Sequence, residues 1–350
     1  MKNSNYVTKE FLEKLSEEVK NGYVVAHRNE YKPITNYTYS RLTEQENHWN
    51  EVTLRTRGLI LDDNRRIIFN CPSKFFNFQQ NNFANNTYER LKNDFKIYEK
   101  LDGSAIWVVR DSEYGLVVSS KSSFNSEHAQ WAREIIKEKF FPSIVSFEEG
   151  ICYCFELIHP ENRIVVDYGE EKTLKLWGLK TQSGETIELE DNRIDTSYFE
   201  TPKLLGTNND KTAIDDYINQ KNVEGVVLKG IGDDRIKIKS QTYLELHRIK
   251  TDCTPNRILE LLMSGKRVSD YDFPDEFLKE VQSYEDIYLK KYQQIYNQIE
   301  SAEKVLHNLS DKEVGLAKID GFLKSGIFNL RRNRDISKLI WRKVKEENVL

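Results

Sequence analysis

Residues 98–111, YEKLDGSAIWVVRD, place a lysine and an aspartate one residue apart between two segments with β-strand character. Aromatic and β-branched residues on both sides of KLDG predict one strand that ends here and another that begins. Lys100 therefore lies on a turn at a strand end. It is either an ordinary solvated charge or a nucleophile within reach of a substrate, and the rest of the chain has to distinguish these two interpretations.

Strand-like segments continue on both sides of this turn, to about residue 240. Short runs rich in β-branched and aromatic residues predict strands at 22–28, 58–63, 65–70, 104–111, 115–121, 150–158, 162–168, 173–180, 185–190, 224–230 and 235–240. Turn chemistry at 111–115 and 230–234 favours hairpins, so the sheets are expected to be antiparallel. A helix at about 8–20 precedes the strands, and one helix interrupts them, with Ser126 as N-cap and an apolar face of Ala132, Ile135, Ile136 and Phe140.

Beyond residue 245 the strand signal gives way to helical spacing, bounded by Pro, Gly, Ser and Asp. The helical segments are 255–265, 274–309, 310–326 and 333–348. The predicted fold class is therefore α+β. An antiparallel-sheet domain at 1–245 is followed by an all-helical domain at 246–350.

Composition sets limits on the kind of protein. The 350 residues, 38% of them hydrophobic, suffice for one large or two medium domains. The charged N-terminal segment lacks the apolar stretch of a signal peptide and no run is long and apolar enough to span a membrane, which favours a cytoplasmic protein. The cysteines fit no disulfide framework or zinc site, so reduced thiols are expected at Cys71, Cys152, Cys154 and Cys253.

The formal net charge of -4 gives no general indication of nucleic-acid binding, but charge is unevenly distributed. From Lys324 to Lys345 the chain is rich in basic residues, and its single acid is Asp335. This run is either a solvated helix face or a contact surface for a polyanion.

A lysine attacks phosphorus only as the neutral amine, and its ordinary pKa of about 10.4 leaves little of that form at neutral pH. Nearby cations and burial both lower such a pKa. Lys237 and Lys239 alternate along one predicted strand and so point to the same side. They are either solvated or gathered around an anion such as a triphosphate, whose developing charge they would stabilise.

Three carboxylates accompany these lysines at strand positions: Asp102, Glu156 and Glu224. Carboxylates that meet phosphates usually do so through Mg²⁺, which retains several waters. Each one alone is more often a hairpin charge or half of an ion pair. The interpretation depends on the set.

The ordered set resembles the covalent nucleotidyltransferases, the superfamily of ATP-dependent ligases and capping enzymes. The motifs that carry the resemblance are EKLDGS (99–104), SSKSS (119–123), CFELIHPENRIV (154–165), LKLWGL (174–179), VEGVVLK (223–229) and IKIK (236–239). Upstream, RTRGLILDD (55–63) and PSKFFNF (72–78) look like elements of the phage T4 RNA ligase 1 type. The resemblance covers about residues 20–245 and implies an ATP-grasp-like ligase core.

The resemblance implies a three-step reaction with ATP and with Mg²⁺, or alternatively Mn²⁺. Lys100 takes AMP from ATP, the AMP passes to an RNA 5′-phosphate, and a 3′-hydroxyl then seals the strands. It further implies that Gly103 allows close backbone approach, and that Ser122 departs from the family glycine. The resemblance assigns catalysis to Lys100, Asp102, Lys237 and Lys239. It assigns contacts with the nucleotide to Tyr37, Arg57, Lys74, Phe76 or its neighbour Phe75, Glu99, Lys100, Lys121, Glu156, Glu224, Lys237 and Lys239. It assigns binding of the metal ion, mostly through water, to Asp102, Glu156 and Glu224.

Other members of the superfamily fit less well. DNA ligases and capping enzymes follow the core with a small β-barrel, whereas helices follow it here. The resemblance therefore favours a monomeric phage-type RNA ligase for 5′-phosphate and 3′-hydroxyl ends, with the helical domain selecting broken tRNA. The alternatives are an inactive module that binds RNA ends, and a structural protein in which the motifs are coincidences.

Overall fold

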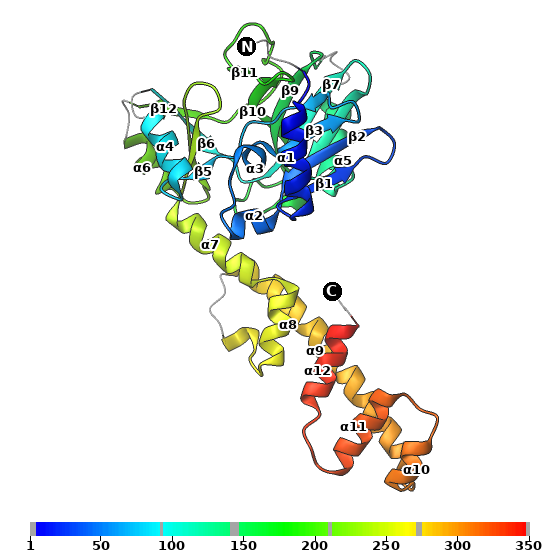
Figure 1. Cartoon of the computed structure of the whole chain (residues 1–350). Coiled ribbons are helices and arrows are strands. Elements are labelled where there is room, and N and C mark those ends of the chain that lie inside the picture. The colour runs from blue at the N-terminus through cyan, green and yellow to red at the C-terminus, as the bar shows by residue number, and fades with distance from the viewer. Residues whose placement is uncertain (1–4, 92–93, 141–146, 209–211, 271–274, 348–350) are drawn as a thin grey trace. The chain divides into compact units, whose positions relative to one another are not determined.

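The computed structural model describes residues 5–91, 94–140, 147–208, 212–270 and 275–347 (Figure 1). The chain divides into two compact units, Met1–Leu244 and Glu245–Leu350. The first contains three β-sheets with helices packed on them, and the described part of the second is helical. The α+β class with a helical C-terminal region is thereby confirmed.

The first sheet is antiparallel, in the order β1-β2-β3-β4. Helix α1 (Lys9–Lys20) packs against it, with Leu15 in contact with a core that includes Leu59 and Ile67. Helices α2 (Arg41–Gln45) and α3 (Glu51–Arg55) lie between β2 and β3 in the chain. The strand bounds are Val24–Arg28, Ile34–Tyr39, Arg57–Asp62 and Ile67–Phe69.

The second sheet is also antiparallel, in the order β11-β10-β9-β7-β8. Strand β7 is buried on both faces, which explains its unbroken apolar run. Ile106 and Val108 pack in the core beside helix α5 (Glu127–Ile135), while Trp107 and Val109 pack against the first sheet. The bounds are Ser104–Asp111 for β7, Gly115–Ser120 for β8, Ile151–Ile158 for β9, Thr173–Thr181 for β10 and Thr186–Ile187 for β11.

The third sheet has the order β12-β6-β13-β14-β5, and only the pairing of β5 with β14 is parallel. Apolar residues on one face, among them Ile97 and Val226, pack with helices α4 (Asn82–Leu91) and α6 (Thr212–Ile218). The bounds are Phe76–Asn77 for β5, Lys96–Lys100 for β6, Leu204–Thr207 for β12, Gly225–Lys229 for β13 and Arg235–Lys239 for β14.

The turn around Lys100 connects two of these sheets. Strand β6 ends at Lys100 in the third sheet, and β7 begins at Ser104 in the second. Close backbone approach requires the glycine between them, because a Cβ on Gly103 would lie 2.3 Å from the carbonyl oxygen of Leu157. The expectation of a turn between two strands is confirmed.

Most predicted strands are present, but the segment 162–168 is not a strand. Its valine-rich composition was misleading, because the backbone N–H groups of Val165 and Val166 donate to the side chain of Asp102 instead of to a neighbouring strand. The chain there continues from a short 3₁₀ helix, η3 (Pro160–Asn162). Only one helix was expected to interrupt the strands, but the structure adds α2, α3, α4 and α6. Strands β2, β5 and β12 were also not expected.

Helix α5 confirms its predicted cap and apolar face. The side chain of Ser126 accepts a hydrogen bond from the N–H of Ala129. The helix continues into a π-helical segment, η1 (Ile136–Phe140), and its buried residues include Ala132, Ile135, Ile136 and Phe140. All four cysteines are free and buried.

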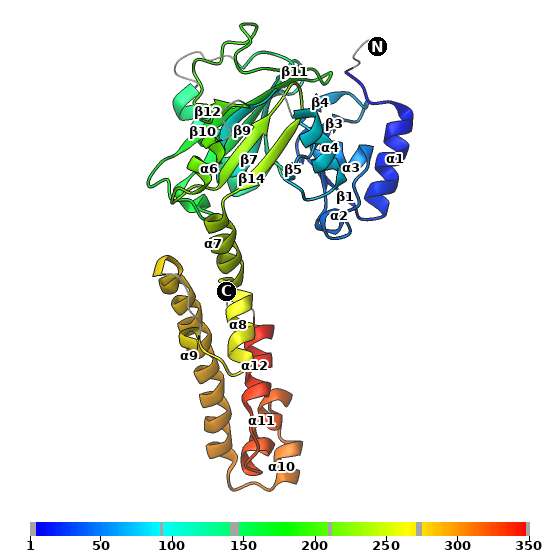
Figure 2. The same ribbon diagram turned by 90° about the vertical axis from the view of Figure 1, so that its left-hand side faces the viewer.

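In the second unit, helix α9 (Asp275–Leu306) runs alongside α8 (Pro255–Met263), α11 (Gly321–Arg331) and α12 (Ser337–Glu346) (Figure 2). Helix α7 (Gln241–Asp252) precedes them, and the predicted segment 310–326 is divided between α10 (Asp311–Leu316) and α11. Their shared core includes Ile299, Ile340 and Val344. None of the helices within the described ranges has the length and apolar character needed to cross a bilayer.

Candidate active site

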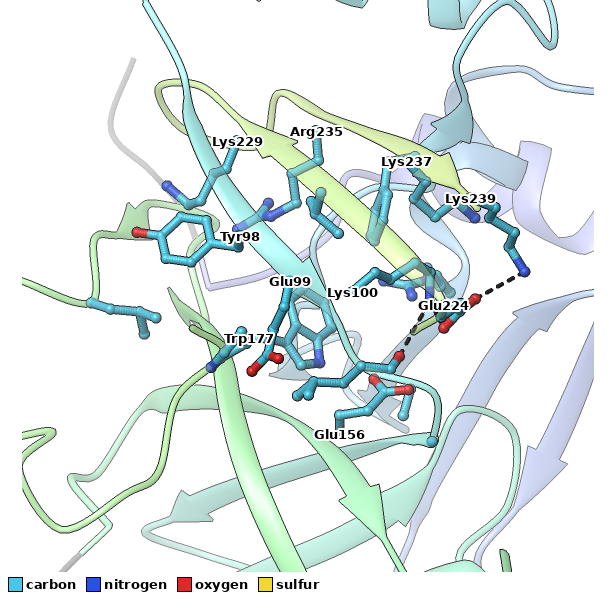
Figure 3. Close-up of a pocket in the computed structure, with 18 residues that line it drawn as sticks. Tyr98, Glu99, Lys100, Glu156, Trp177, Glu224, Lys229, Arg235, Lys237 and Lys239 are labelled. Atoms are coloured by element: carbon cyan, nitrogen blue, oxygen red, sulfur yellow. Dashed lines mark hydrogen bonds and ion pairs between the residues drawn. The ribbon is translucent and has the colours of Figure 1, made fainter. Parts of the chain in front are cut away.

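A cavity of about 260 Å³ lies beside the end of β6, between the second and third sheets (Figure 3). Strands β6, β13 and β14 supply one wall, and Ala105, Glu156 and Trp177 of the second sheet contribute to the other. Its charged lining residues are Arg57, Glu99, Lys100, Glu156, Glu224, Lys229, Arg235, Lys237 and Lys239.

Lys100 is held by a buried carboxylate. Its Nζ lies 2.6 Å from Oε2 of Glu224 and 3.3 Å from the carbonyl oxygen of Leu101. The other oxygen of Glu224 lies 2.9 Å from Nζ of Lys239. Glu224 is 3% exposed, and so buried a carboxylate requires cationic partners. Glu224 thus joins Lys100 to Lys239, whereas the pair expected to gather around one anion was Lys237 and Lys239.

Lys237 differs from Lys100 and Lys239, which both form ion pairs with Glu224. It alternates with Lys239 on β14 and lines the same cavity. Within the described ranges no carboxylate lies at ion-pair distance from its Nζ. Burial lowers the pKa of Lys237 well below its usual value, and the nearby cations Lys100, Lys74 and Arg57 lower it further. An anion bound beside Lys237 would raise this pKa again, so anion binding and the charging of Lys237 favour each other.

Glu156 faces the cavity from β9 (Figure 3). Burial raises its pKa to about 7; the nearby Lys100 opposes this shift and Glu224 adds to it. Glu99 also lines the cavity, where its carboxylate accepts hydrogen bonds from the N–H of Lys203 at 2.8 Å and the hydroxyl of Tyr217 at 3.2 Å.

Asp102 does not line this cavity, contrary to its expected place beside the other two carboxylates. Its Oδ2 accepts the N–H groups of Val165 and Val166, each at 2.8 Å, and its Oδ1 accepts the hydroxyl of Tyr243 at 2.8 Å. Asp102 is 4% exposed. Its carboxylate therefore connects the KLDG turn to a loop and to helix α7.

No cluster of three or more Asp, Glu, His or Cys side chains in the described part of the chain is arranged to hold a metal ion. Glu156 and Glu224 nevertheless both line the cavity. Mg²⁺ commonly uses one or two carboxylates with water and substrate phosphates, so this pair fits a water-mediated site better than a direct three-carboxylate site.

Aromatic rings surround Arg57. Its guanidinium carbon lies 4.7 Å from the ring centroid of Phe75 and 5.4 Å from that of Trp177. Either Phe76 or Phe75 was expected to pack beside the base. Phe76 is 3% exposed and packs on Trp49 in the core. The side chain that lines the cavity is its neighbour Phe75.

Lys74, Lys121 and Tyr37 do not line the cavity. Lys74 donates to the hydroxyl of Tyr39 at 3.0 Å, and Nζ of Lys121 lies 3.9 Å from the ring centroid of Tyr39. Burial by itself would raise the pKa of Tyr39, but the nearby Lys121 and Lys74 outweigh burial and lower this pKa below its usual value. Tyr37 packs against the core beneath α1, so the tyrosine beside these lysines is Tyr39.

Four charged or aromatic residues that line the cavity were not among the site residues predicted from the sequence: Tyr98, Trp177, Lys229 and Arg235. A signal existed for Arg235, since it alternates with Lys237 and Lys239 along one strand and must share their face. Trp177 lies within a recognised motif, but its orientation depends on a β-bulge that the sequence does not reveal.

Comparison with known proteins places the chain among ligases. A family model described as RNA ligase matches residues 55–243. The RNA ligase of Rhodothermus phage RM378 is 23% identical over an alignment of 330 residues, and the match covers 75% of this chain and 74% of that protein.

Solved structures give similarities at lower identity. An archaeal ATP-dependent RNA ligase is 13% identical, with a TM-score of 0.49 and coverage of 92% of this chain and 96% of that one. A Naegleria gruberi RNA ligase variant with AMP and Mn is 17% identical, with a TM-score of 0.40. That match covers 51% of this chain and 58% of that one. Because the family model spans more than half of the sequence, the chain belongs to the RNA ligase family.

Proposed function

We propose that this protein joins RNA 5′-phosphate and 3′-hydroxyl ends with ATP through a lysine-AMP intermediate on Lys100. The observation that carries the proposal is the position of Lys100, which lines one cavity together with Lys237 and the carboxylates Glu156 and Glu224. Membership of the RNA ligase family supports the same reaction class.

In the first step, Nζ of Lys100 forms a bond to the α-phosphorus of ATP as the bond to the β-phosphate oxygen breaks and pyrophosphate leaves. Lys100 has to release Glu224 and pass a proton to water before it attacks, because an ammonium has no free electron pair. Lys237 and Lys239 then stabilise the charge that develops on the phosphate oxygens. Mg²⁺ or Mn²⁺, held through water by Glu156 and Glu224, would neutralise further phosphate charge.

In the later steps, the AMP moves to the 5′-phosphate of an RNA strand, and a 3′-hydroxyl attacks that phosphate with release of AMP. Positioning and charge stabilisation are the main tasks of the protein in such in-line displacements.

The experiment that tests this proposal is transfer of label from ATP labelled at the α-phosphate to the denatured chain. Label on the wild type and none on Lys100→Ala would support the proposal. The matched control is Lys96→Ala on the same strand, whose lysine pairs with Glu190 away from Lys100, and which should label normally. If folded wild type accepts no label from ATP or GTP, an inactive module that binds RNA ends becomes the better interpretation.

We further propose that the helical unit contacts RNA, with broken tRNA as the preferred substrate, and that the enzyme is a cytoplasmic monomer. Exposed basic residues on α12 and before it support an RNA contact: Arg332, Arg334, Lys338, Arg342 and Lys345. The variant Arg334→Gln/Lys338→Gln should bind broken tRNA more weakly and with a shallower salt dependence, while the lysine-AMP step on Lys100 proceeds at the wild-type rate. Unchanged salt dependence would contradict the RNA contact.

A further inference from the structure

Arg235 occupies an unusual position in the wall of the cavity. It lies on β14 and is 3% exposed, and Figure 3 shows its side chain beside Lys229 and Tyr98, away from Lys239 and its ion pair with Glu224. Neither Nη1 nor Nη2 has a hydrogen-bond partner among the described residues. Because buried donors without acceptors cost free energy, this arrangement favours a ligand that supplies acceptors.

The nearest carboxylate, that of Asp233, forms a long ion pair with Arg235 and no hydrogen bond to Nη1. Oδ1 of Asp233 lies 3.6 Å from Nη1, which is beyond hydrogen-bond distance. The same carboxylate already accepts the Nζ of Lys180 at 2.5 Å and the hydroxyl of Thr186 at 2.8 Å. Asp233 therefore balances the charge of Arg235, but it accepts no hydrogen bond from Nη1 or Nη2 of Arg235.

Trp177 provides a second unpaired donor in the same cavity. Its Nε1 is buried and lacks a partner in the described part of the chain. The register of β10 against β9 shifts between Leu176 and Gly178, so Trp177 is the extra residue of a β-bulge, a device that redirects side chains. Its ring lies 5.6 Å from the guanidinium carbon of Arg235.

The character of these donors indicates their ligand. A flat group that fits against the ring of Trp177 and offers acceptors at its edge is a purine, whose ring nitrogens N1, N3 and N7 accept hydrogen bonds. Phosphates would lie at Lys100, Lys237 and Lys239, which are separate from Arg235 in Figure 3.

We propose that Arg235 determines nucleotide specificity by donating a hydrogen bond to a ring nitrogen of the adenine, with Trp177 against the base. This inference rests on the proposed function, since it concerns the nucleotide consumed in the first step. It adds to that function a residue that reads the base.

The test compares lysine-AMP formation from ATP and from 1-deaza-, 3-deaza- and 7-deaza-ATP, each of which lacks one ring acceptor. Wild type should lose about tenfold or more in kcat/KM with one of the three, the effect of one hydrogen bond from a charged donor. In Arg235→Met, ATP and that analogue should react at similar rates. Equal use of all four nucleotides by wild type would overturn the inference even if Arg235→Met failed to fold.

A control variant separates base reading from a structural ion pair. Asp233→Asn removes the countercharge of Arg235 but leaves its donors, so it should still discriminate against the same analogue. Loss of discrimination in folded Asp233→Asn would overturn the inference in favour of a structural role. Reaction with ATP but no discrimination defeats this inference alone, whereas no reaction of wild type with ATP defeats the proposed function as well.

Discussion

Oε2 of Glu224 lies 2.6 Å from Nζ of Lys100, so a buried carboxylate holds the proposed nucleophile as an ion pair. The same carboxylate holds Lys239 through its other oxygen. In this arrangement the lysine is positioned but not yet able to attack. Lys100 would become free to attack once Glu224 no longer holds it, and Glu224 is also one of the two cavity carboxylates that would hold the water of a metal ion.

Replacing Glu224 by Gln should therefore destabilise the first unit strongly. Lys100 and Lys239 would lose their shared countercharge, and breaking a buried ion pair typically costs about 3 kcal/mol or more. Urea denaturation followed by circular dichroism would measure the loss. The matched control is Glu44→Gln. The carboxylate of Glu44 is half exposed and lies 2.8 Å from Nζ of Lys74, so its loss should lower the free energy of unfolding by about 1 kcal/mol or less. Equal losses in both variants would contradict a special role for Glu224.

Two lysines of one strand should respond in opposite ways to substitution by Met. Lys237→Met removes a buried amine for which the described residues offer no ion-pair partner, so the free energy of unfolding should rise by about 1 kcal/mol at pH 7. Lys239→Met leaves Glu224 with one cation fewer and should lower that free energy. Both should slow lysine-AMP formation, by about a hundredfold for Lys237 if it stabilises the transition state. Full rates in both variants would contradict the charge argument.

Glu156 should make stability depend on pH. Burial raises its pKa in the folded chain to about 7 from an ordinary value of 4.5, so between these values the folded state binds more protons than the unfolded state. The free energy of unfolding contributed by Glu156 therefore falls as pH rises through this window. Glu156→Gln should be more stable than wild type at pH 8, with the difference shrinking toward pH 5. Exposed Glu149, changed to Gln, serves as control and should show no such trend.

The sequence predicted the members of the cavity where strand alternation was sufficient. Lys237 and Lys239 share a face because they are two residues apart, and the motifs around Lys100, Glu156 and Glu224 place each at a strand position. These five side chains do line one cavity.

Choices between neighbouring residues could not be made from sequence. Phe75 and Phe76 differ by one position, and only tertiary packing decides which one enters the core. The segment 162–168 had the composition of a strand, but its backbone donors are taken by Asp102, a contact across 63 residues of chain that no local pattern indicates. Trp177 required knowledge of a bulge.

Substitutions at Asp102 can show whether this carboxylate positions the KLDG turn or binds the water of a metal ion. Its carboxylate accepts hydrogen bonds from Val165, Val166 and Tyr243, so Asp102→Asn should destabilise the first unit, by about 2 kcal/mol for the weakened buried acceptor. Tyr243→Phe removes one of the same hydrogen bonds and should destabilise in the same direction by a smaller amount. In both variants the Mg²⁺ concentration for half-maximal lysine-AMP formation should match wild type, because the connection of the KLDG turn to its loop is what has changed. An increase in that concentration for Asp102→Asn alone, at unchanged stability, would instead place Asp102 in the water shell of the metal, as its motif had suggested.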